Sequence, residues 1–247
     1  MKLILGDGLL GNEIHRQTGW AYISRKQNGI DFANIKSYES YLNSGFTNRV
    51  IEVINCIAQT NTINESDEDI RNNWEINYKG VMDLTDLCSK RDIKLTHIST
   101  DYVYAKSKRF AREHEVPVHY DSVYTYTKLL ADSYIQARSK NYLILRSSFK
   151  SNPFPYDYGW IDFIGNFDYV DVIAKLIIEL IEYDARGLFN VGTEIKTMYD
   201  LAKRTNKKVK PTYKETKYID SNDISMCLIK MENFLQTERF KRGLILQ

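Results

Sequence analysis

Short apolar runs alternate along the chain with longer stretches whose apolar residues recur at helical spacing. The short runs predict buried strands at 2–5, 20–24, 49–55, 94–99, 142–146 and 187–191. The amphipathic stretches predict helices that start after Gly11, at 66, 123, 169 and 199, and that end near 17, 90, 139, 183 and 205. Strands and helices are therefore expected to alternate along most of the sequence.

This alternation predicts an α/β fold, a Rossmann-type doubly wound parallel sheet with a small C-terminal substrate lobe. The clearest interruption is at 151–159, which contains Pro153 and Pro155. We expect residues 1–150 to form a dinucleotide-binding Rossmann domain. Residues 151–247 are expected to form the small substrate-binding lobe, with elements at about 169–192 returning to the Rossmann core.

A glycine pattern lies between the first strand and the first helix. In a Gly-x-Gly-x-x-Gly turn, the first glycine permits the tight turn and the second lets the backbone approach a pyrophosphate. The third lets helix and strand pack closely. The helix N-terminus then faces the phosphate charge. The residues predicted to hold the cofactor here are Gly6, Asp7, Gly8, Leu9, Leu10 and Gly11.

Two residues bear on the choice between NADP and NAD. Arg25 follows the end of the second predicted strand, where an arginine receives the 2′-phosphate of NADP. Asp31 comes 20 residues after Gly11, near the place of a carboxylate that binds the ribose of NAD. We expect Asp31 on a further short strand beside the adenine end. The pattern favours NADP(H) over NAD(H).

Tyr124 and Lys128 are four residues apart, so a helix would place both side chains on one face. A cation ~4 Å from the phenol is worth ~4 kcal/mol at an effective dielectric of ~20, about three pKa units. That shift would bring Tyr124 into the range for acid–base chemistry at neutral pH. Thr100 ends the strand before this helix. The predicted catalytic residues are Thr100, Tyr124 and Lys128.

Composition narrows the classes of function. The net charge of +2 argues against nucleic acid as the main partner, and no apolar run approaches the ~20 residues of a membrane span. Three cysteines without paired spacing favour reduced thiols and a cytoplasmic location. The four histidines lack metal-binding spacing, so no metal site is predicted.

Several ordered motifs resemble the extended short-chain dehydrogenase/reductases, and within them the dTDP-4-dehydrorhamnose reductase-like group. Residues 99–104 read Ser-Thr-Asp-Tyr-Val-Tyr, similar to that group's Ser-Thr-Asp-Tyr-Val-Phe. Residues 124–129 match its Tyr-x-x-x-Lys-Leu helix, and 55–60 resemble its Asn-Ala-Ala segment. Residues 145–149 and 169–174 resemble its Leu-Arg-Thr-Ser-Trp strand and Tyr-Val-Asp-Asp-Leu-Ala helix start. The similarity covers residues 1 to about 205.

The resemblance implies an NAD(P)H-dependent reductase of a 4-keto-6-deoxy nucleotide sugar. In this reading Tyr124 donates the proton, Lys128 binds the nicotinamide ribose and tunes Tyr124, and Thr100 hydrogen-bonds the substrate oxygen. The resemblance further implies that Ala58, Thr60 and Asn77 lie on the cofactor side. On the substrate side it implies Thr100, Asp101, Tyr102 and Phe149.

Other readings stay open at this point. A nucleotide-sugar 4-epimerase with bound NAD is one alternative. A non-catalytic NADP-binding subunit is another, because the regulatory subunit of methionine adenosyltransferase resembles the same reductase group. Phe149 replaces the group's tryptophan, and the first glycine interval is one residue shorter than usual. The helices at 69–90 and 123–139 often form a dimer interface in this superfamily, and core packing explains their apolar stripes equally well. A homodimer is therefore compatible with the resemblance but is not required by these two helices.

Overall fold

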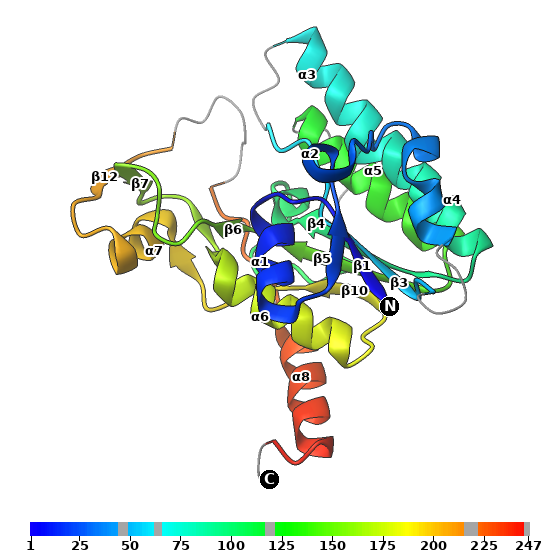
Figure 1. Cartoon of the computed structure of the whole chain (residues 1–247). Coiled ribbons are helices and arrows are strands. Elements are labelled where there is room, and N and C mark those ends of the chain that lie inside the picture. The colour runs from blue at the N-terminus through cyan, green and yellow to red at the C-terminus, as the bar shows by residue number, and fades with distance from the viewer. Residues whose placement is uncertain (44–48, 62–65, 117–121, 215–221, 245–247) are drawn as a thin grey trace. The chain divides into compact units, whose positions relative to one another are not determined.

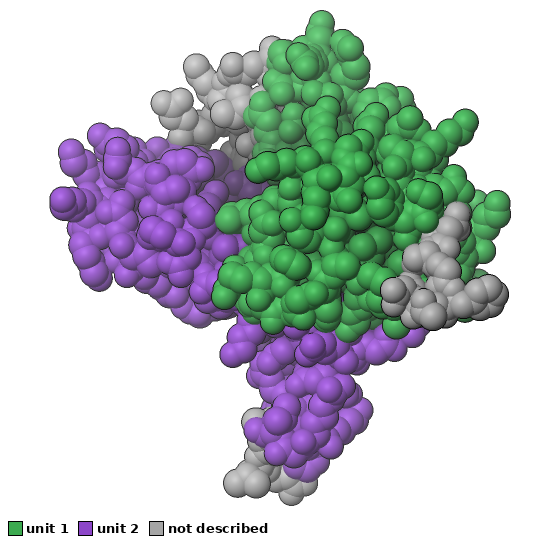
Figure 2. All heavy atoms as spheres, viewed as in Figure 1, with its two compact units in different colours: residues 1–99, 119–144 green, residues 100–118, 145–247 purple. Residues whose placement is uncertain are grey.

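The computed structural model describes residues 1–43, 49–61, 66–116, 122–214 and 222–244. The chain forms two compact units, one of residues 1–99 and 119–144 and the other of residues 100–118 and 145–247 (Figure 2). These units divide the chain differently from the expected boundary at 150, because residues 100–118 group with the C-terminal part. The division into domains at 150 stays a prediction.

Among the described residues, six strands form one sheet in the order β10-β5-β4-β3-β1-β2 (Figure 1). The strands are β1 (Lys2–Leu5), β2 (Ala21–Ile23), β3 (Glu52–Asn55), β4 (Lys94–Thr100), β5 (Tyr142–Ser147) and β10 (Gly187–Asn190). β1 pairs in parallel with β2 and with β3, and β3 pairs in parallel with β4. The sheet confirms the predicted fold class, with strand ends shifted by up to three residues.

The helices of the first unit flank this sheet. They are α1 (Leu9–Thr18), α2 (Arg25–Asn28), η1 (Ile35–Ser37), η2 (Glu39–Asn43), α3 (Asp67–Asn72), η3 (Asn73–Lys79), α4 (Gly80–Lys90) and α5 (Val123–Arg138). α1 covers one face, and α4 with α5 covers the other (Figure 1). Within the described part of the chain, no helix has the length and apolar character needed to cross a bilayer.

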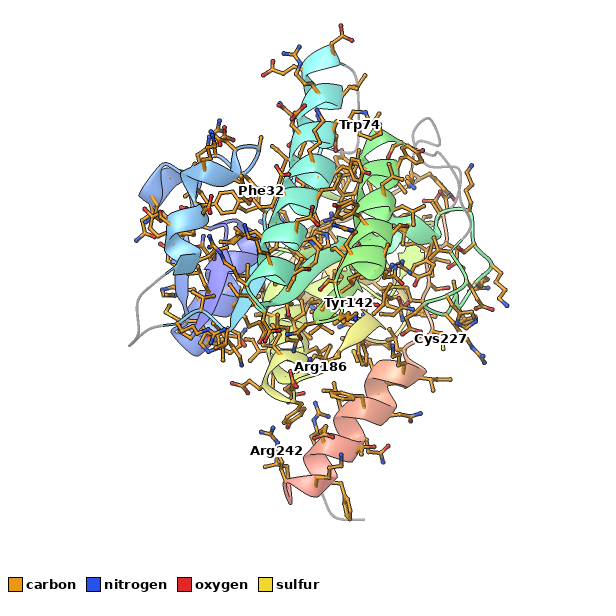
Figure 3. All side chains as sticks on the ribbon, turned by 90° about the vertical axis from the view of Figure 1, so that its right-hand side faces the viewer. Phe32, Trp74, Tyr142, Arg186, Cys227 and Arg242 are labelled. Carbon is orange, nitrogen blue, oxygen red and sulfur yellow. The ribbon has the colours of Figure 1, made fainter. Side chains whose placement is uncertain are left out.

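The predicted helix at 66–90 is one continuous helical run made of α3, η3 and α4. Ser66 caps its N-terminus by accepting a hydrogen bond from the Asp69 N–H. The middle part, η3, has wider π-helical turns, which the apolar spacing alone did not predict. Figure 3 shows this run beside α5 with Trp74 where they meet, and the Trp74 and Tyr126 rings make an edge contact at 6.0 Å. This segment therefore packs on α5 through its π-helical part.

The second unit contains smaller elements around an aromatic core. They are η4 (Asp101–Tyr104), β6 (Phe149–Lys150), β7 (Tyr158–Trp160), β8 (Ile164–Gly165), β9 (Asp168–Tyr169), α6 (Val170–Glu182), β11 (Lys196–Thr197), α7 (Met198–Thr205), β12 (Lys210–Thr212) and α8 (Ile229–Lys241). Phe163 and Phe167 stack at 5.8 Å in the centre of a cluster that includes Phe154 and Leu201. The paired short strands hold the segment after Pro155 against α7.

Candidate active site

The strand order places a natural binding position at the C-terminal ends of β1 and β3. From β1 the chain moves outward to β2, then returns to the other side of β1 with β3. Such a reversal leaves a crevice beyond the carboxyl ends of the two strands, where open α/β sheets bind their ligands. The glycine turn follows β1, and residues 56–59 follow β3, so both reach this crevice.

The glycine turn has the geometry that the sequence predicted. Gly6 has φ +101°, a conformation that side chains rarely adopt, and its N–H donates to the Ile23 carbonyl at 2.8 Å. A Cβ on Gly11 would lie 2.0 Å from the Gly6 carbonyl oxygen, so α1 packs directly on the turn. A Cβ on Gly8 would meet open space. Gly8 thus leaves room for a ligand in front of the N-terminus of α1.

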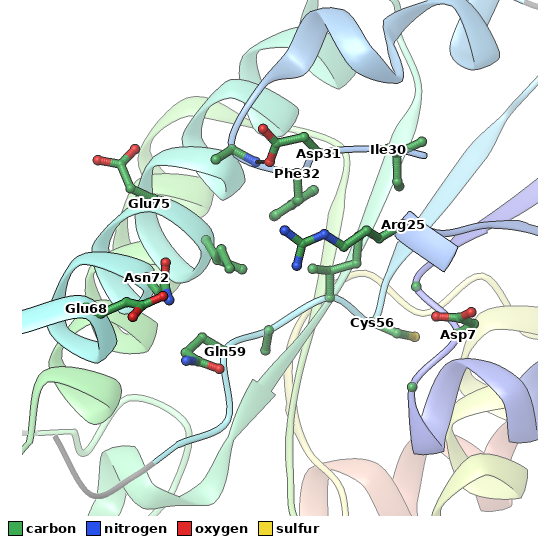
Figure 4. Close-up of a pocket in the computed structure, with 16 residues that line it drawn as sticks. Asp7, Arg25, Ile30, Asp31, Phe32, Cys56, Gln59, Glu68, Asn72 and Glu75 are labelled. Carbon is green, nitrogen blue, oxygen red and sulfur yellow. Dashed lines mark hydrogen bonds between the residues drawn. The ribbon is translucent and has the colours of Figure 1, made fainter. Parts of the chain in front are cut away.

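A pocket of about 590 Å³ opens in front of this turn (Figure 4). Its lining residues come from the ends of β1, β2 and β3 and from the α3–η3 segment: Gly6, Asp7, Gly8, Arg25, Ile30, Asp31, Phe32, Ala33, Cys56, Ile57, Ala58, Gln59, Glu68, Asn72, Glu75 and Ile76. Arg25 reaches into the pocket from the start of α2 (Figure 4). Leu10 is buried and Leu9 is exposed, and neither is part of the lining.

The β2 end of the pocket is held by a serine that the sequence analysis did not single out. Ser24 caps α2 by accepting from the Gln27 N–H, and its hydroxyl donates to the Asp7 carboxylate at 2.9 Å. Ser24 is fully buried. This bond ties the glycine turn to the segment that carries Arg25.

Asp31 lines the pocket, but it does not lie on a strand as expected. Its N–H donates to the Ser37 hydroxyl at 2.8 Å, and its carboxylate accepts from the Ala33 N–H at 3.1 Å. Asp31 is thus part of an Asx-type turn, because the side chain takes over a backbone hydrogen bond. Arg25 and Asp31 therefore line the same pocket.

The segment after β3 is fastened by Asn77. The Asn77 amide accepts from the Gln59 N–H and donates to the Gln59 carbonyl, both at 2.9 Å, and it also donates to Asn73. This two-way bond fixes the loop that brings Ala58 into the pocket, while Thr60 is exposed outside the lining. Asn77 therefore holds the loop after β3 in place, and its expected position on the cofactor side stays a prediction.

Tyr124 and Lys128 lie in the first two turns of α5, and both are buried. The Lys128 Nζ donates to the Ile98 carbonyl at 2.7 Å and lies 3.2 Å from Nε2 of His97. Burial lowers the pKa of Lys128 to about 8, and the nearby Asp132 acts against this shift. The roles of Tyr124 and Lys128 in proton transfer stay predictions.

The residues predicted on the substrate side belong to the second unit. Thr100 caps η4, since its hydroxyl accepts from the Tyr102 N–H at 3.2 Å. Asp101 is fully buried, and burial raises its pKa to about 7 although Lys150 acts against this. Its Oδ2 has no hydrogen-bond partner within the described residues. Phe149 is half-buried at the start of β6.

The second unit also contains an aromatic pocket of about 290 Å³ that the sequence analysis missed. It is lined by Lys150, Phe154, Tyr156, Tyr158, Trp160 and Met198. Burial lowers the pKa of Lys150, whereas the Asp101 carboxylate raises it. Four aromatic residues within 154–160, next to two prolines, were a sequence signal for this pocket, although we interpreted the segment only as a break in regular structure.

Among the described residues, no group of three or more histidine, cysteine or carboxylate side chains could hold a metal ion. His119, one of the four histidines in the sequence analysis, lies outside the described residues.

A family model described as RmlD substrate binding domain matches residues 1–150. No curated protein matches the chain. Among solved structures, a dTDP-4-dehydrorhamnose reductase from Clostridium acetobutylicum has a TM-score of 0.77 at 21% identity, covering 99% of this chain and 99% of that chain. A dTDP-4-dehydrorhamnose reductase from Bacillus anthracis, in complex with NADP, has a TM-score of 0.76 at 18% identity, covering 97% of this chain and 98% of that chain.

The enzyme WbmG from Bordetella bronchiseptica, in complex with NAD, is also similar. It has a TM-score of 0.70 at 13% identity, covering 96% of this chain and 88% of that chain. At these identities the likeness is one of fold, and it extends over nearly the whole length of the chain.

Proposed function

The chain belongs to the family described as RmlD substrate binding domain, and from that premise we propose that it is an NAD(P)H-dependent reductase of a 4-keto-6-deoxy nucleotide sugar. The observation that carries the proposal is the pocket at the reversal of strand order, with Gly8 open in front of the N-terminus of α1. A dinucleotide pyrophosphate fits such a position because the helix end offers free N–H groups to its charge.

The cofactor supplies hydride to the substrate carbonyl when it is bound. We expect the glycine turn to hold the pyrophosphate and Arg25 to bind the 2′-phosphate of NADP, which favours NADP(H) over NAD(H). Asp31 in the same lining is the residue that would instead bind the ribose of NAD. Among similar structures, one of the reductases was solved with NADP and WbmG was solved with NAD.

The chemistry that the chain itself supplies is that of the short-chain dehydrogenase/reductases. Tyr124 gives its phenolic proton to the oxygen that becomes the C4 hydroxyl, and Lys128 positions Tyr124 and the nicotinamide ribose. Thr100 hydrogen-bonds the same substrate oxygen while charge develops on it. Support comes from the predicted helix, which is observed as α5 and carries both Tyr124 and Lys128 in its first turns.

The aromatic pocket of the second unit supports a ring-containing substrate. Trp160, Tyr156 and Tyr158 offer flat apolar faces, and Lys150 offers a cation for an anionic group. In the rhamnose-type reductases a tryptophan at the position of Phe149 is expected to stack on the sugar. We propose that the aromatic pocket supplies part of this stacking surface in the present chain.

The experiment that tests the function is a screen of NADPH and NADH oxidation against a panel of 4-keto nucleotide sugars, preceded by a measurement of cofactor binding by fluorescence. Binding of neither cofactor at high concentration would overturn the cofactor assignment. Cofactor binding without turnover of any sugar would support the regulatory-subunit reading instead. Interconversion of C4 epimers with tightly held NAD and no net oxidation would support the epimerase.

A further inference from the structure

Asp7 places a carboxylate between the first two glycines of the turn that is proposed to hold an anionic pyrophosphate. Like charges repel, so such a turn accommodates a carboxylate best when that carboxylate faces another part of the ligand. Oδ2 of Asp7 accepts a hydrogen bond from the Ser24 hydroxyl at 2.9 Å, and Ser24 directly follows β2. The carboxylate is thus held at the β2 end of the pocket.

Ser24 fixes this position through both of its hydrogen bonds. Its hydroxyl oxygen accepts from the Gln27 N–H at 3.0 Å, so its single hydrogen remains for Asp7. Ser24 is fully buried, and a buried hydroxyl that lost its acceptor would be left unsatisfied. The cap of α2 therefore holds the Asp7 carboxylate in a fixed direction.

The second oxygen of the carboxylate is available to a ligand. Asp7 is half-buried in the pocket lining, and within the described residues its Oδ1 has no hydrogen-bond partner. An ionised carboxylate accepts hydrogen bonds on both oxygens. Oδ1 can therefore accept from a ligand group that donates, such as a ribose hydroxyl.

The end of β2 is where a Rossmann-type site distinguishes the 2′-hydroxyl of NAD from the 2′-phosphate of NADP. In this chain β2 is followed by Ser24, Arg25 and Lys26, with no carboxylate among them. Asp31 also lines the pocket, but it is exposed and its carboxylate is engaged with the Ala33 N–H at 3.1 Å. Asp7 thus supplies a carboxylate at the place where β2 itself supplies none.

We propose that Asp7 is a specificity-determining residue of the cofactor site. Oδ1 of Asp7 accepts a hydrogen bond from the 2′-hydroxyl of the adenosine ribose, and the same carboxylate opposes a 2′-phosphate at this position. The proposal rests on the proposed function, because it requires a dinucleotide in this pocket. It limits the preference for NADP(H), since Arg25 attracts the 2′-phosphate while Asp7 repels it, and it moves the ribose contact of NAD from Asp31 to Asp7.

Asp7→Asn is the direct test, because it removes the charge and retains an oxygen for Ser24. The affinities of the full-length protein for NADH and NADPH are measured by fluorescence titration. We expect NADH affinity to fall about 10-fold, because a hydrogen bond to a charged acceptor becomes a neutral one. NADPH affinity should rise, because a repelling charge is removed. An unchanged ratio of the two affinities, or a parallel loss of both, would overturn the proposal.

Asp31→Asn is the matched comparison, since it removes the same charge from the same pocket lining. It should change the ratio of NADPH to NADH affinity less than Asp7→Asn does. A larger change in the Asp31 variant would return the ribose contact to Asp31 and overturn the assignment to Asp7.

Ser24→Ala tests the hydrogen bond that holds the carboxylate. Release of Oδ2 should shift the affinity ratio toward NADPH, as in Asp7→Asn. If Ser24 served only as the cap of α2, the loss of the cap would disturb Arg25 instead and NADPH affinity would fall, which would overturn this part of the proposal.

Ser66→Ala is the matched control for the loss of a cap. Ser66 caps α3 and donates to the Asp69 carboxylate at 2.8 Å, and it is not part of the pocket lining. This variant should leave the ratio of the two affinities unchanged. If Asp7→Asn does not fold, the comparison of Ser24→Ala with Ser66→Ala still decides.

The proposed function and this inference fail in different ways. An unchanged ratio in a protein that reduces a 4-keto nucleotide sugar would overturn the role of Asp7 alone. A changed ratio without turnover of any sugar would support the role of Asp7 and count against the reductase. Binding of neither cofactor would overturn both.

Discussion

At the scale of single residues, the proposed chemistry depends on side chains that are almost completely buried. Tyr124 is 9% exposed and Lys128 is 1% exposed. A group in such a place exchanges protons only with the partners that the fold gives it, so its neighbours determine its protonation. For Lys128 these neighbours are His97 and the Ile98 carbonyl.

Tyr124→Phe removes the phenolic hydroxyl and keeps the ring. We expect turnover of the 4-keto sugar to fall by roughly 10²–10⁴, because general acid catalysis is lost while the pocket for the dinucleotide is unchanged. The control is Tyr126→Phe, since Tyr126 has no lysine four residues later and packs on Trp74. NADPH oxidation and NADPH binding are both measured. Equal activity of the Tyr124 variant and wild type would contradict the assignment of the acid.

Arg25→Ala tests the choice of cofactor. A charge-assisted bond to the 2′-phosphate is worth about 1.5–3 kcal/mol, so NADPH affinity should fall about 10- to 100-fold while NADH affinity changes little. Asp31→Asn is the companion variant, and it should affect NADH more than NADPH if the ribose of NAD uses that carboxylate. Both affinities are read from fluorescence titrations. A parallel loss for the two cofactors in Arg25→Ala would remove the basis for preferring NADP.

At the scale of elements, the glycine turn shows how one motif combines folding and binding. The same pattern contains a glycine that the fold requires, Gly11, and a glycine that faces open space, Gly8. Element positions followed from the hydrophobic pattern because buried strands and one-sided helices differ in their apolar spacing. The π-helical turns of η3 and the turn at Asp31 did not, because packing and side-chain hydrogen bonds decide them.

Gly11→Ala and Gly8→Ala should therefore differ. At Gly11 the added Cβ would lie 2.0 Å from the Gly6 carbonyl oxygen, so either α1 or the turn must move. We expect a loss of several kcal/mol in the free energy of unfolding, as for overpacked sites. Gly8 has φ −67° and free space, so its variant should keep its stability and lose affinity for NADPH. Thermal unfolding and cofactor titration separate the two, and equal melting temperatures of both variants would refute this account.

At the scale of the whole molecule, two buried ionisable groups should shape the dependence of stability on pH. Burial raises the pKa of Asp101 from 3.8 to about 7, so the folded protein keeps a proton that the unfolded chain has lost. The contribution of Asp101 to the free energy of unfolding is most favourable below pH 3.8 and is lost as the pH rises through 7. Burial lowers the pKa of Lys128 from 10.5 to about 8. The contribution of Lys128 to the free energy of unfolding therefore becomes more favourable as the pH rises from 8 to 10.5.

Both effects reduce stability most between pH 7 and 8. We expect Asp101→Asn and Lys128→Met each to raise the free energy of unfolding at pH 7.5 by roughly 1–3 kcal/mol. The gain from Asp101→Asn should vanish near pH 4, and the gain from Lys128→Met near pH 10.5. Denaturant unfolding at the three pH values measures this. A gain that does not depend on pH would show that the cause is packing instead of ionisation.

Sequence alone determined the order along the chain of the six strands of the main sheet and of the longer helices up to residue 205, because this order depends on local spacing. It also determined the glycine turn and the position of Tyr124 four residues before Lys128. The tertiary structure alone decided which residues distant in sequence became partners. It placed Asn55 and Lys128 on the two sides of His97, tied Asp7 to Ser24, and gathered the aromatic residues of 154–160 with Lys150 and Met198. Such partners are set by strand register and helix packing, and the local hydrophobic period contains no information about either.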